Sequence, residues 1–378
     1  MRTFKFSQFQ LHARIVRSIR HGRNISRGAL ADEMGTSPST MGMHVDDLIQ
    51  QGFLEESGLE QGGIGRPKRL LRLIPEAGWF AGIEFTGGRL QAERLNFGGE
   101  REKSHIVMLP KHIRAPALLK TILDAITALQ AGAKGPLLAV GVGSPGFIDA
   151  QAGHVVYSEF LDDWNNIPLV AEIRSHFPVA VAVENNLHVI ALGERWFGDG
   201  RDADDYVIVR ARNGFGLGII KEGRLLGGAH HGVGEIGLWP WPLDGGTDFV
   251  HNALSARHVW QKLSGSQAEP PDNLTDAMVE FADKSGPEWD DVVDTYARVL
   301  GLTQLLIDTK LYFLHGPLVA LGTRFCEDVK ARSLQIIPQL LHSPIQLVPS
   351  RLGPEAGALG AAGLAMEAWD PSEKSAAA

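Results

Sequence analysis

Two segments of this chain, about 125 residues apart, repeat one pattern of strands and glycine turns. FAGIEFTGGRLQAERLNFGGE begins at Phe80 and YVIVRARNGFGLGIIKEGRL begins at Tyr206. Each consists of an apolar run, a glycine-rich turn, a second apolar run and a second turn. Such self-similarity indicates an internal duplication. The pattern therefore favours an α/β domain in which two similar lobes are built from strands joined by glycine turns.

The rest of this large domain, residues 77–378, is expected to continue in the same style. LLAVGVGSPGFID at 137–149 indicates a buried strand entering a tight turn, and PLVALGT at 317–323 indicates another strand. Residues 288–315 favour a long helix. Glycine turns at the floor of a cleft between two lobes suit a nucleotide or a sugar, because glycine lets backbone N–H groups approach phosphates. Glycine hairpins without a ligand are also common, so this signal alone is weak.

Length and composition describe a globular chain of more than one domain. With 378 residues, 44% hydrophobic and 21% charged, the chain exceeds what one hydrophobic core usually supports. No window approaches the roughly 18 apolar residues of a membrane span, and the first residues lack the apolar core of a secretory signal. We therefore expect a cytoplasmic protein without a membrane partner. Cys326 is the only cysteine, which excludes an intrachain disulfide and a zinc site made of several thiolates.

The basic part of the chain is residues 1–76, which we predict to form a separate domain. The whole chain has a net charge of -8, but this segment carries 11 Lys and Arg against 8 Asp and Glu. Ser26 and Ser37 are good N-caps of two short helices, and Gly35 can adopt the left-handed conformation that ends the first. Pro38 is favoured at the first position of the second helix. Apolar residues recur at helical spacing, namely Ala29, Leu30, Met34, Met41, Val45, Leu48 and Ile49. Two helices around a short turn predict a helix-turn-helix.

Candidate contacts to DNA lie on the second helix and in the segment after it. The outer face of that helix offers groups suited to a major groove and its phosphates: Ser37, Ser39, Thr40, Met43 and His44. In LEESGLEQGGIGRPKRLLRLIP, two apolar stretches flank a glycine-rich tip, which indicates a β-hairpin wing. The tip is expected to enter the minor groove of DNA, and the residues that would contact it are Arg66, Pro67, Lys68 and Arg69. A structural pair of helices with a solvated basic loop is the alternative to a winged helix-turn-helix that binds operator DNA.

Four motifs in order give the chain a resemblance to the ROK family of repressors and sugar kinases. VGVGSPGFID resembles the family's GxGxPGxxD turn, and VENNLHVIALGE resembles its VENDANAAALAE segment. GGAHHGVGEIG resembles its GAxGxAGEIGH segment, and GPEAGALGAAGLA resembles its C-terminal helix. The resemblance implies a winged helix-turn-helix followed by a two-lobed actin- and hexokinase-like domain, a duplicated ribonuclease H-like fold. It also implies the branch that contains the xylose and N-acetylglucosamine repressors.

The chain departs from the family's kinases where they have their catalytic base. The family's Asp, which takes the proton of the sugar hydroxyl, is replaced by Asn186, whose amide can hold a hydroxyl but cannot take its proton. The family's nucleotide loops are altered too. Residues 84–89 replace DIGGTK, Arg212 and Asn213 replace Gly-Thr, and residues 322–324 replace GGG. The resemblance with these changes implies a protein that is not an enzyme and has no cofactor.

The family's zinc loop is also replaced. Its CxCGxxGC sequence is absent, and Leu238 stands at the position of a further histidine ligand. Trp239 and Trp241 are expected to brace this loop, with stacking on a ligand as the alternative. Polar side chains nearby lack a metal-like spacing, so we expect them to be solvated or hydrogen-bonded and expect no metal. They are His230, His231, Asp244, Asp248 and His251.

Three residues remain of the family's sugar site, namely Asn185, Asn186 and Glu235. A carboxylate beside two amides can bind vicinal hydroxyls through paired hydrogen bonds. Leu238 and Phe160 stand where the family has polar residues, so the pocket should be more apolar than in a hexose kinase. The alternative is that Glu184, Asn185 and Asn186 merely cap the helix that follows them.

The sequence as a whole favours a transcriptional regulator, in the first place a repressor of carbohydrate-related genes that senses a small sugar-like ligand. A homodimer or homotetramer would match an inverted repeat whose half-sites lie one helical turn, about 34 Å, apart. Two alternatives remain open. One is a sugar kinase with an attached DNA-binding domain, and the other is a scaffold that acts through DNA and a protein partner without any ligand.

Overall fold

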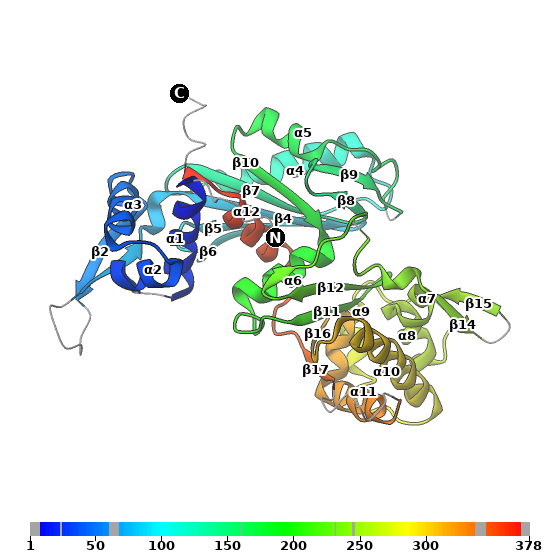
Figure 1. Cartoon of the computed structure of the whole chain (residues 1–378). Coiled ribbons are helices and arrows are strands. Elements are labelled where there is room, and N and C mark those ends of the chain that lie inside the picture. Colours follow the sequence, from blue (N-terminus) through cyan, green and yellow to red (C-terminus); the bar gives the residue numbers. More distant parts are fainter. Residues whose placement is uncertain are drawn as a thin grey trace. The chain divides into compact units, whose positions relative to one another are not determined.

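The computed structural model describes residues 8–22, 25–59, 68–159, 161–230, 232–243, 246–336 and 345–371. Its contacts divide the chain into two compact units (Figure 1). The first unit consists of Met1–Glu184 and Ala361–Ala378, and the second is Asn185–Gly360. The predicted boundary between residues 76 and 77 falls inside the first unit, and a separate DNA-binding domain remains a proposal. Within the described ranges, no helix is long and apolar enough to cross a membrane.

The first unit begins with helices and a small sheet. The helices are α1 (Gln8–Gly22), α2 (Arg27–Met34) and α3 (Pro38–Gln50), and the strands are β1 (Ile25–Ser26), β2 (Leu54–Leu59) and β3 (Arg69–Leu73). Strand β3 pairs antiparallel with both β1 and β2, so the predicted helix-turn-helix and hairpin are confirmed. Leu30, Met41, Val45 and Leu48 are fully buried as predicted. The prediction for Ala29 is wrong, because Ala29 is exposed and its neighbour two residues on is buried instead.

The larger sheet of the first unit has the strand order β10-β7-β4-β5-β6. These strands are β4 (Trp79–Thr86), β5 (Arg89–Asn96), β6 (Arg101–Met108), β7 (Leu137–Ser144) and β10 (Ala180–Asn185). Helices α4 (Ala115–Gln130) and α5 (Leu169–His176) bury apolar side chains against one face. Helix α12 (Ala356–Ala368) packs on the other face, where a Cβ added at Gly141 would lie 1.8 Å from the Ala361 carbonyl oxygen. Glycine therefore permits backbone contact between β7 and α12.

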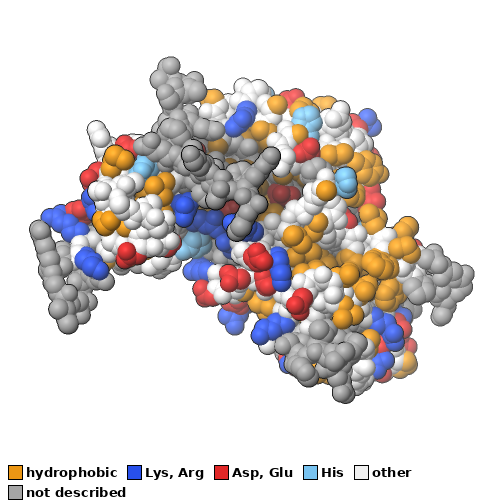
Figure 2. All heavy atoms as spheres, in the orientation of Figure 1, with side chains coloured by type: hydrophobic (Ala, Val, Ile, Leu, Met, Phe, Trp, Pro, Cys, Tyr) orange, Lys and Arg blue, Asp and Glu red, His pale blue; other side chains and the backbone are white. Residues whose placement is uncertain are grey.

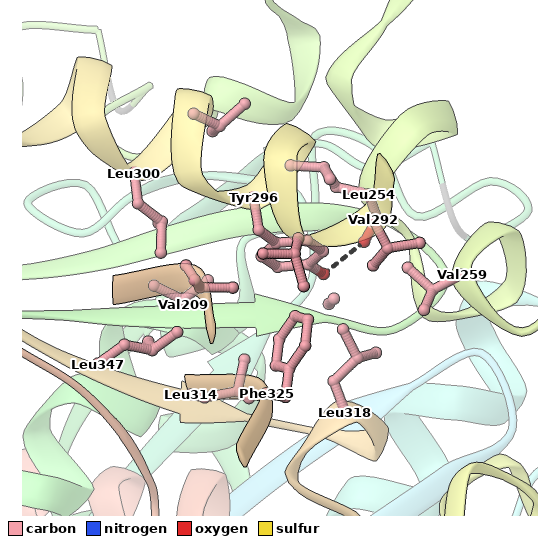
Figure 3. Close-up of a cluster of buried hydrophobic side chains, with 14 of the residues drawn as sticks. Val209, Leu254, Val259, Val292, Tyr296, Leu300, Leu314, Leu318, Phe325 and Leu347 are labelled. Atoms are coloured by element: carbon pink, nitrogen blue, oxygen red, sulfur yellow. Dashed lines mark hydrogen bonds between the residues drawn. The ribbon is translucent and has the colours of Figure 1, made fainter. Parts of the chain in front are cut away.

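The second unit is built on a sheet with the order β13-β12-β11-β16-β17. Its strands are β11 (Tyr206–Ala211), β12 (Phe215–Lys221), β13 (Arg224–Leu225), β16 (Leu311–His315) and β17 (Gln346–Pro349). Helices α10 (Pro287–Ile307) and α11 (Gly322–Ile336) cover one face and supply much of the apolar core in Figure 3. In that core the Tyr296 hydroxyl donates to the Leu254 carbonyl at 2.8 Å. Helix α6 (Asn186–Phe197) packs on the sheet through glycine, since a Cβ at Gly218 would lie 2.5 Å from the Leu187 oxygen.

The two large sheets share one topology, which confirms the predicted duplication. In the first unit, β4 pairs antiparallel with β5 and parallel with β7. In the second unit, β11 pairs antiparallel with β12 and parallel with β16 in the same way. Both sheets therefore follow the order third, second, first, fourth and fifth strand of their own segment. The predicted α/β class with two similar lobes is thus confirmed.

Two sequence predictions for the second unit are wrong. Residues 288–315 do not form one helix, because α10 ends at Ile307 and β16 begins at Leu311. The predicted strand at 317–323 is instead the short 3-10 helix η3 (Pro317–Leu321), with Pro317 in its first turn after Gly316 at a φ of 97°. A short apolar run alone does not distinguish a strand from a buried helical turn. The strand in this region is β16, which ends at His315, so the loop after it begins with Gly316 and Pro317. Residues 322–324, which were expected to follow a strand, begin helix α11 instead.

Shorter elements complete the described chain. The strands are β8 (Phe147–Asp149), β9 (His154–Tyr157), β14 (Pro240–Leu243) and β15 (Gly246–Phe249), and the last two form a hairpin. The helices are η1 (Pro75–Ala77), η2 (Ile236–Leu238), α7 (Val250–Leu254), α8 (Ala256–Ser264) and α9 (Leu274–Val279).

Candidate nucleic-acid interface and ligand site

Local hydrogen bonds at the helix ends fix α2 and α3 around their turn. The Ser26 hydroxyl accepts from the Ala29 N–H at 3.4 Å, and the Ser37 hydroxyl accepts from the Thr40 N–H at 3.1 Å. Gly35 follows α2 in the left-handed region, with φ of 64°. The predicted caps at both ends of the turn are therefore confirmed.

The outer face of α3 presents small polar side chains and one large apolar side chain. Ser37, Ser39 and Thr40 are exposed, and Met43 is 57% exposed. A hollow on this face is lined by Ser39, Gly42, Met43, His44, Asp46, Asp47 and Gln50. Asp46 and Gln50, three and seven residues after Met43, were not predicted to lie on this face. Helical spacing could have found them, because residues three, four and seven apart share a face.

The expectation that His44 lies on the outer face is wrong. Its side chain is only 5% exposed, and its Nδ1 lies 3.0 Å from Nε2 of the equally buried His12 on α1. His44 follows Met41 by three residues and precedes Leu48 by four, so its position belongs to the buried face of α3. Burial, and then the neighbouring His44, lower the pKa of His12. The contact between the two imidazoles therefore joins α1 to α3.

The wing is present as the β2–β3 hairpin, although part of its predicted tip lies outside the described residues. Arg66 and Pro67 fall in that part, so their predicted contacts remain a proposal. Lys68 and Arg69 are exposed at the start of β3. The Arg69 guanidinium forms an ion pair with Glu56 on β2, which ties the two strands of the wing together.

A junction of aromatic side chains connects this N-terminal part to the large sheet of the same unit. Phe53 before β2, Phe97 after β5 and Trp369 after α12 are nearly fully buried. The ring centroid of Trp369 lies 5.0 Å from that of Phe53 and 5.1 Å from that of Phe97, in edge-to-face geometry. Arg20 of α1 lies 5.5 Å from the centroids of Phe80 and Phe97 and donates to the Phe97 carbonyl at 2.8 Å. We call Phe53, Phe80, Phe97 and Trp369 the aromatic junction.

The predicted ligand-binding residues lie at the starts of two elements of the second unit. Asn185 is the N-cap of α6, and its side-chain oxygen accepts from the Leu187 N–H at 2.7 Å. The capping role left open by the sequence is therefore confirmed for Asn185. Asn186, the first residue of α6, is half-buried, and so is Glu235 directly before η2. A joint contact of these side chains with a ligand remains a proposal.

The loop that replaces the family's zinc site is held by ordinary hydrogen bonds. His251 accepts from the Phe215 N–H through Nδ1 at 2.8 Å, and its ring lies against Gly237 of η2. The Asp248 carboxylate accepts from the Asn252 side chain at 2.7 Å. Trp241 packs against the apolar core as expected, whereas Trp239 is 45% exposed and its bracing role remains a prediction.

Two basic side chains meet at the carboxyl ends of β11 and β16. Arg210 and His315 are partners in the strand register, and both are less than 10% exposed. Burial, and then the charge of Arg210, lower the pKa of His315 to about 3; the Gly353 backbone opposes this shift, and Arg212 adds a smaller lowering effect. His315 is therefore uncharged at neutral pH.

The sequence of this chain is similar to that of a known protein family. The model of the family described as "ROK family" matches residues 80–368, which include most of both large sheets. The xylose repressor of Caldicellulosiruptor bescii is 27% identical over 226 residues, which cover 59% of this chain and 56% of the repressor. The aligned part thus spans little more than half the length of that relative.

Two solved structures share the fold. A ROK family transcriptional regulator, described as a homologue of the Escherichia coli MLC protein, superposes with a TM-score of 0.80 at 20% identity. The superposition covers 95% of this chain and 96% of the regulator, which includes the N-terminal part. A ROK family glucokinase from Streptomyces griseus, solved with glucose and AMPPNP, gives a TM-score of 0.64 at 22% identity. It covers 76% of this chain and 99% of the kinase, so the predicted two-lobed fold is confirmed.

Proposed function

This chain belongs to the ROK family, and we propose that it is a DNA-binding transcriptional regulator, a repressor of carbohydrate-related genes. The observation that carries the proposal is the helix-turn-helix of α2 and α3, whose outer face carries exposed side chains and which is followed by a wing. The 27% identical relative is named as a xylose repressor, which agrees with this assignment. In the proposed complex α3 enters the major groove and the wing approaches the minor groove.

Ligand sensing is the second part of the proposal. Asn185, Asn186 and Glu235 would bind vicinal hydroxyls of a small sugar-like molecule in the second unit. DNA and ligand would then influence each other's affinity by the same factor, because coupling between two binding sites is reciprocal. A thermal-shift screen of sugars, sugar acids and sugar phosphates tests this part, since a ligand of the native state raises the melting temperature. A double substitution, Asn186→Ala with Glu235→Ala, should abolish the shift given by any hit.

Fluorescence anisotropy tests the DNA-binding part. The protein is titrated with duplex DNA from upstream of its own gene and with a scrambled duplex, each over a salt series. We expect tight, sequence-preferring binding that weakens steeply with salt, because phosphate contacts release counterions. Lys68→Ala should weaken binding to both duplexes and reduce the salt slope by about one. Lys120→Ala is the matched control, since it removes an exposed lysine of α4. Equal affinity for both duplexes would refute the proposal.

We propose further that the chain is not a sugar kinase, although kinases share its fold. Asn186 stands at the position of the kinases' base, and an amide cannot take a proton from a hydroxyl. Wild type should therefore release no ADP from ATP with any sugar of a panel. Asn186→Asp restores a carboxylate at this position and should remain inactive as well, because the nucleotide loops differ from those of the kinases. Sugar-dependent ADP release by wild type would return the kinase assignment.

A further inference from the structure

The recognition helix proposed above carries no positive charge. α3 has neither Lys nor Arg, and its second half contains Asp46 and Asp47. Guanine is most often read in the major groove by Arg or Lys, which donate to O6 and N7. α3 must therefore read bases through other groups, and the inference that follows rests on the proposed DNA-binding function.

Most polar groups of α3 already have partners within the protein. The Ser37 hydroxyl lies 2.9 Å from that of Ser39 and 2.8 Å from that of Thr40, in addition to capping the helix. The Asp46 carboxylate accepts from Arg27 of α2 at 2.7 Å. His44 is buried against α1. These groups stabilise the helix-turn-helix, and their hydrogen-bonding capacity is partly used.

Met43 differs from all of these side chains. Among the side chains described at residues 11–22, 25–58 and 68–73, it is the single large apolar one that is exposed, at 57%. It lies between Ser39 and Asp46 on the outer face of α3 and lines the hollow there. The adjacent Gly42 has open space around its Cα, since an added Cβ would meet nothing within 4 Å. A base edge can therefore approach Met43 closely from this side.

We propose that Met43 is a specificity-determining residue that packs against the 5-methyl group of a thymine in the operator half-site. The thymine methyl is the apolar feature of the major groove, and an apolar side chain is its matching contact. Contact with it buries the exposed thioether, whereas a cytosine at the same position offers a polar edge without a methyl group. The recognition is thus made by an apolar contact in place of a charged one.

The test removes only the 5-methyl group of a thymine in the DNA. In the duplex that the anisotropy experiment identifies, each thymine is replaced in turn by deoxyuridine, which keeps all hydrogen-bonding groups. For wild type, we expect one position in each half-site at which affinity falls about fourfold, as expected for one buried methyl group. Met43→Ala should bind the thymine duplex more weakly and should not distinguish thymine from uracil there. Met43→Leu keeps an apolar contact and should retain the distinction.

Each outcome bears on one of the two proposals. If no sequence preference exists in wild type, the regulator proposal itself fails before this test begins. If preference exists but uracil is tolerated at every position, the role of Met43 is refuted and the regulator proposal stands. A uracil effect that persists unchanged in Met43→Ala refutes it as well, because another side chain then contacts the methyl group. Met43 is exposed, so these variants should retain the wild-type melting temperature.

Discussion

Acid should destabilise the second unit through His315, which lies buried beside Arg210. Burial and the neighbouring arginines lower the pKa of His315 from 6.5 to about 3. The unfolded chain therefore binds a proton below pH 6.5 that the folded chain does not bind until about pH 3. Stability from this group is fully present above pH 6.5 and is lost as pH falls toward 3.

The expected magnitude follows from the two pKa values. Each pH unit between them changes the free energy of unfolding by about 1.4 kcal/mol, so the loss at pH 5 is roughly 2 kcal/mol. His12 and His258, whose pKa values are also lowered, titrate in the same direction in wild type. The difference in pH dependence between wild type and His315→Gln isolates the contribution of His315.

Hydrogen exchange of β11 and β16 measures this difference locally, which suits a chain of two units that need not unfold in one step. Exchange protection at pH 7.5 and pH 5 is compared for wild type and His315→Gln, with rates corrected for the intrinsic effect of pH. The variant should lose roughly 2 kcal/mol less protection between these values. His112→Gln, at a side chain that is 85% exposed, is the control. Equal losses in wild type and in His315→Gln would show that the histidine is not held uncharged.

Five further substitutions, each measured by urea unfolding, test packing and helix ends. Gly360→Ala should destabilise by about 2 kcal/mol, because its Cβ would lie 1.6 Å from a backbone oxygen of α6, whereas Gly28→Ala at an exposed position of α2 should stabilise by about 0.5–1 kcal/mol. Trp369→Ala should cost about 3–5 kcal/mol in the first unit, while Trp239→Ala at the surface should cost under about 1 kcal/mol. Arg94→Met should cost about 2–4 kcal/mol, because Arg94 donates to the carbonyls that end α4; a change below about 1 kcal/mol would contradict its capping role.

Local signals explain what the sequence could predict. The caps Ser26 and Ser37 and the left-handed Gly35 act within a few residues, so they were found without any knowledge of the fold. The duplicated glycine turns likewise led to two sheets of the same order. The apolar segment at 317–323 lacked such a signal, and its backbone conformation depends on the turn at Gly316.

Contacts between distant residues explain what the sequence could not predict. The aromatic junction brings Trp369 against Phe53, more than 300 positions earlier in the chain, and no local pattern marks either residue. For His44, the assignment to the outer face neglected its spacing from Met41 and Leu48. For Asn185 two roles were left open, of which capping of α6 is confirmed and ligand contact remains a proposal.

Under the proposed function, the aromatic junction also has a consequence for the spacing of DNA half-sites. A DNA-binding head on a loose tether accepts half-sites at variable separations, because the tether absorbs the difference. Here the N-terminal part with its helix-turn-helix is packed against the large sheet of its own unit through Arg20, Phe53 and Trp369. In a symmetric dimer of such chains, the distance between the two DNA-binding parts would therefore be fixed. One inserted base pair, which shifts a half-site by roughly 3.4 Å and turns it by about 34°, would then move it out of reach.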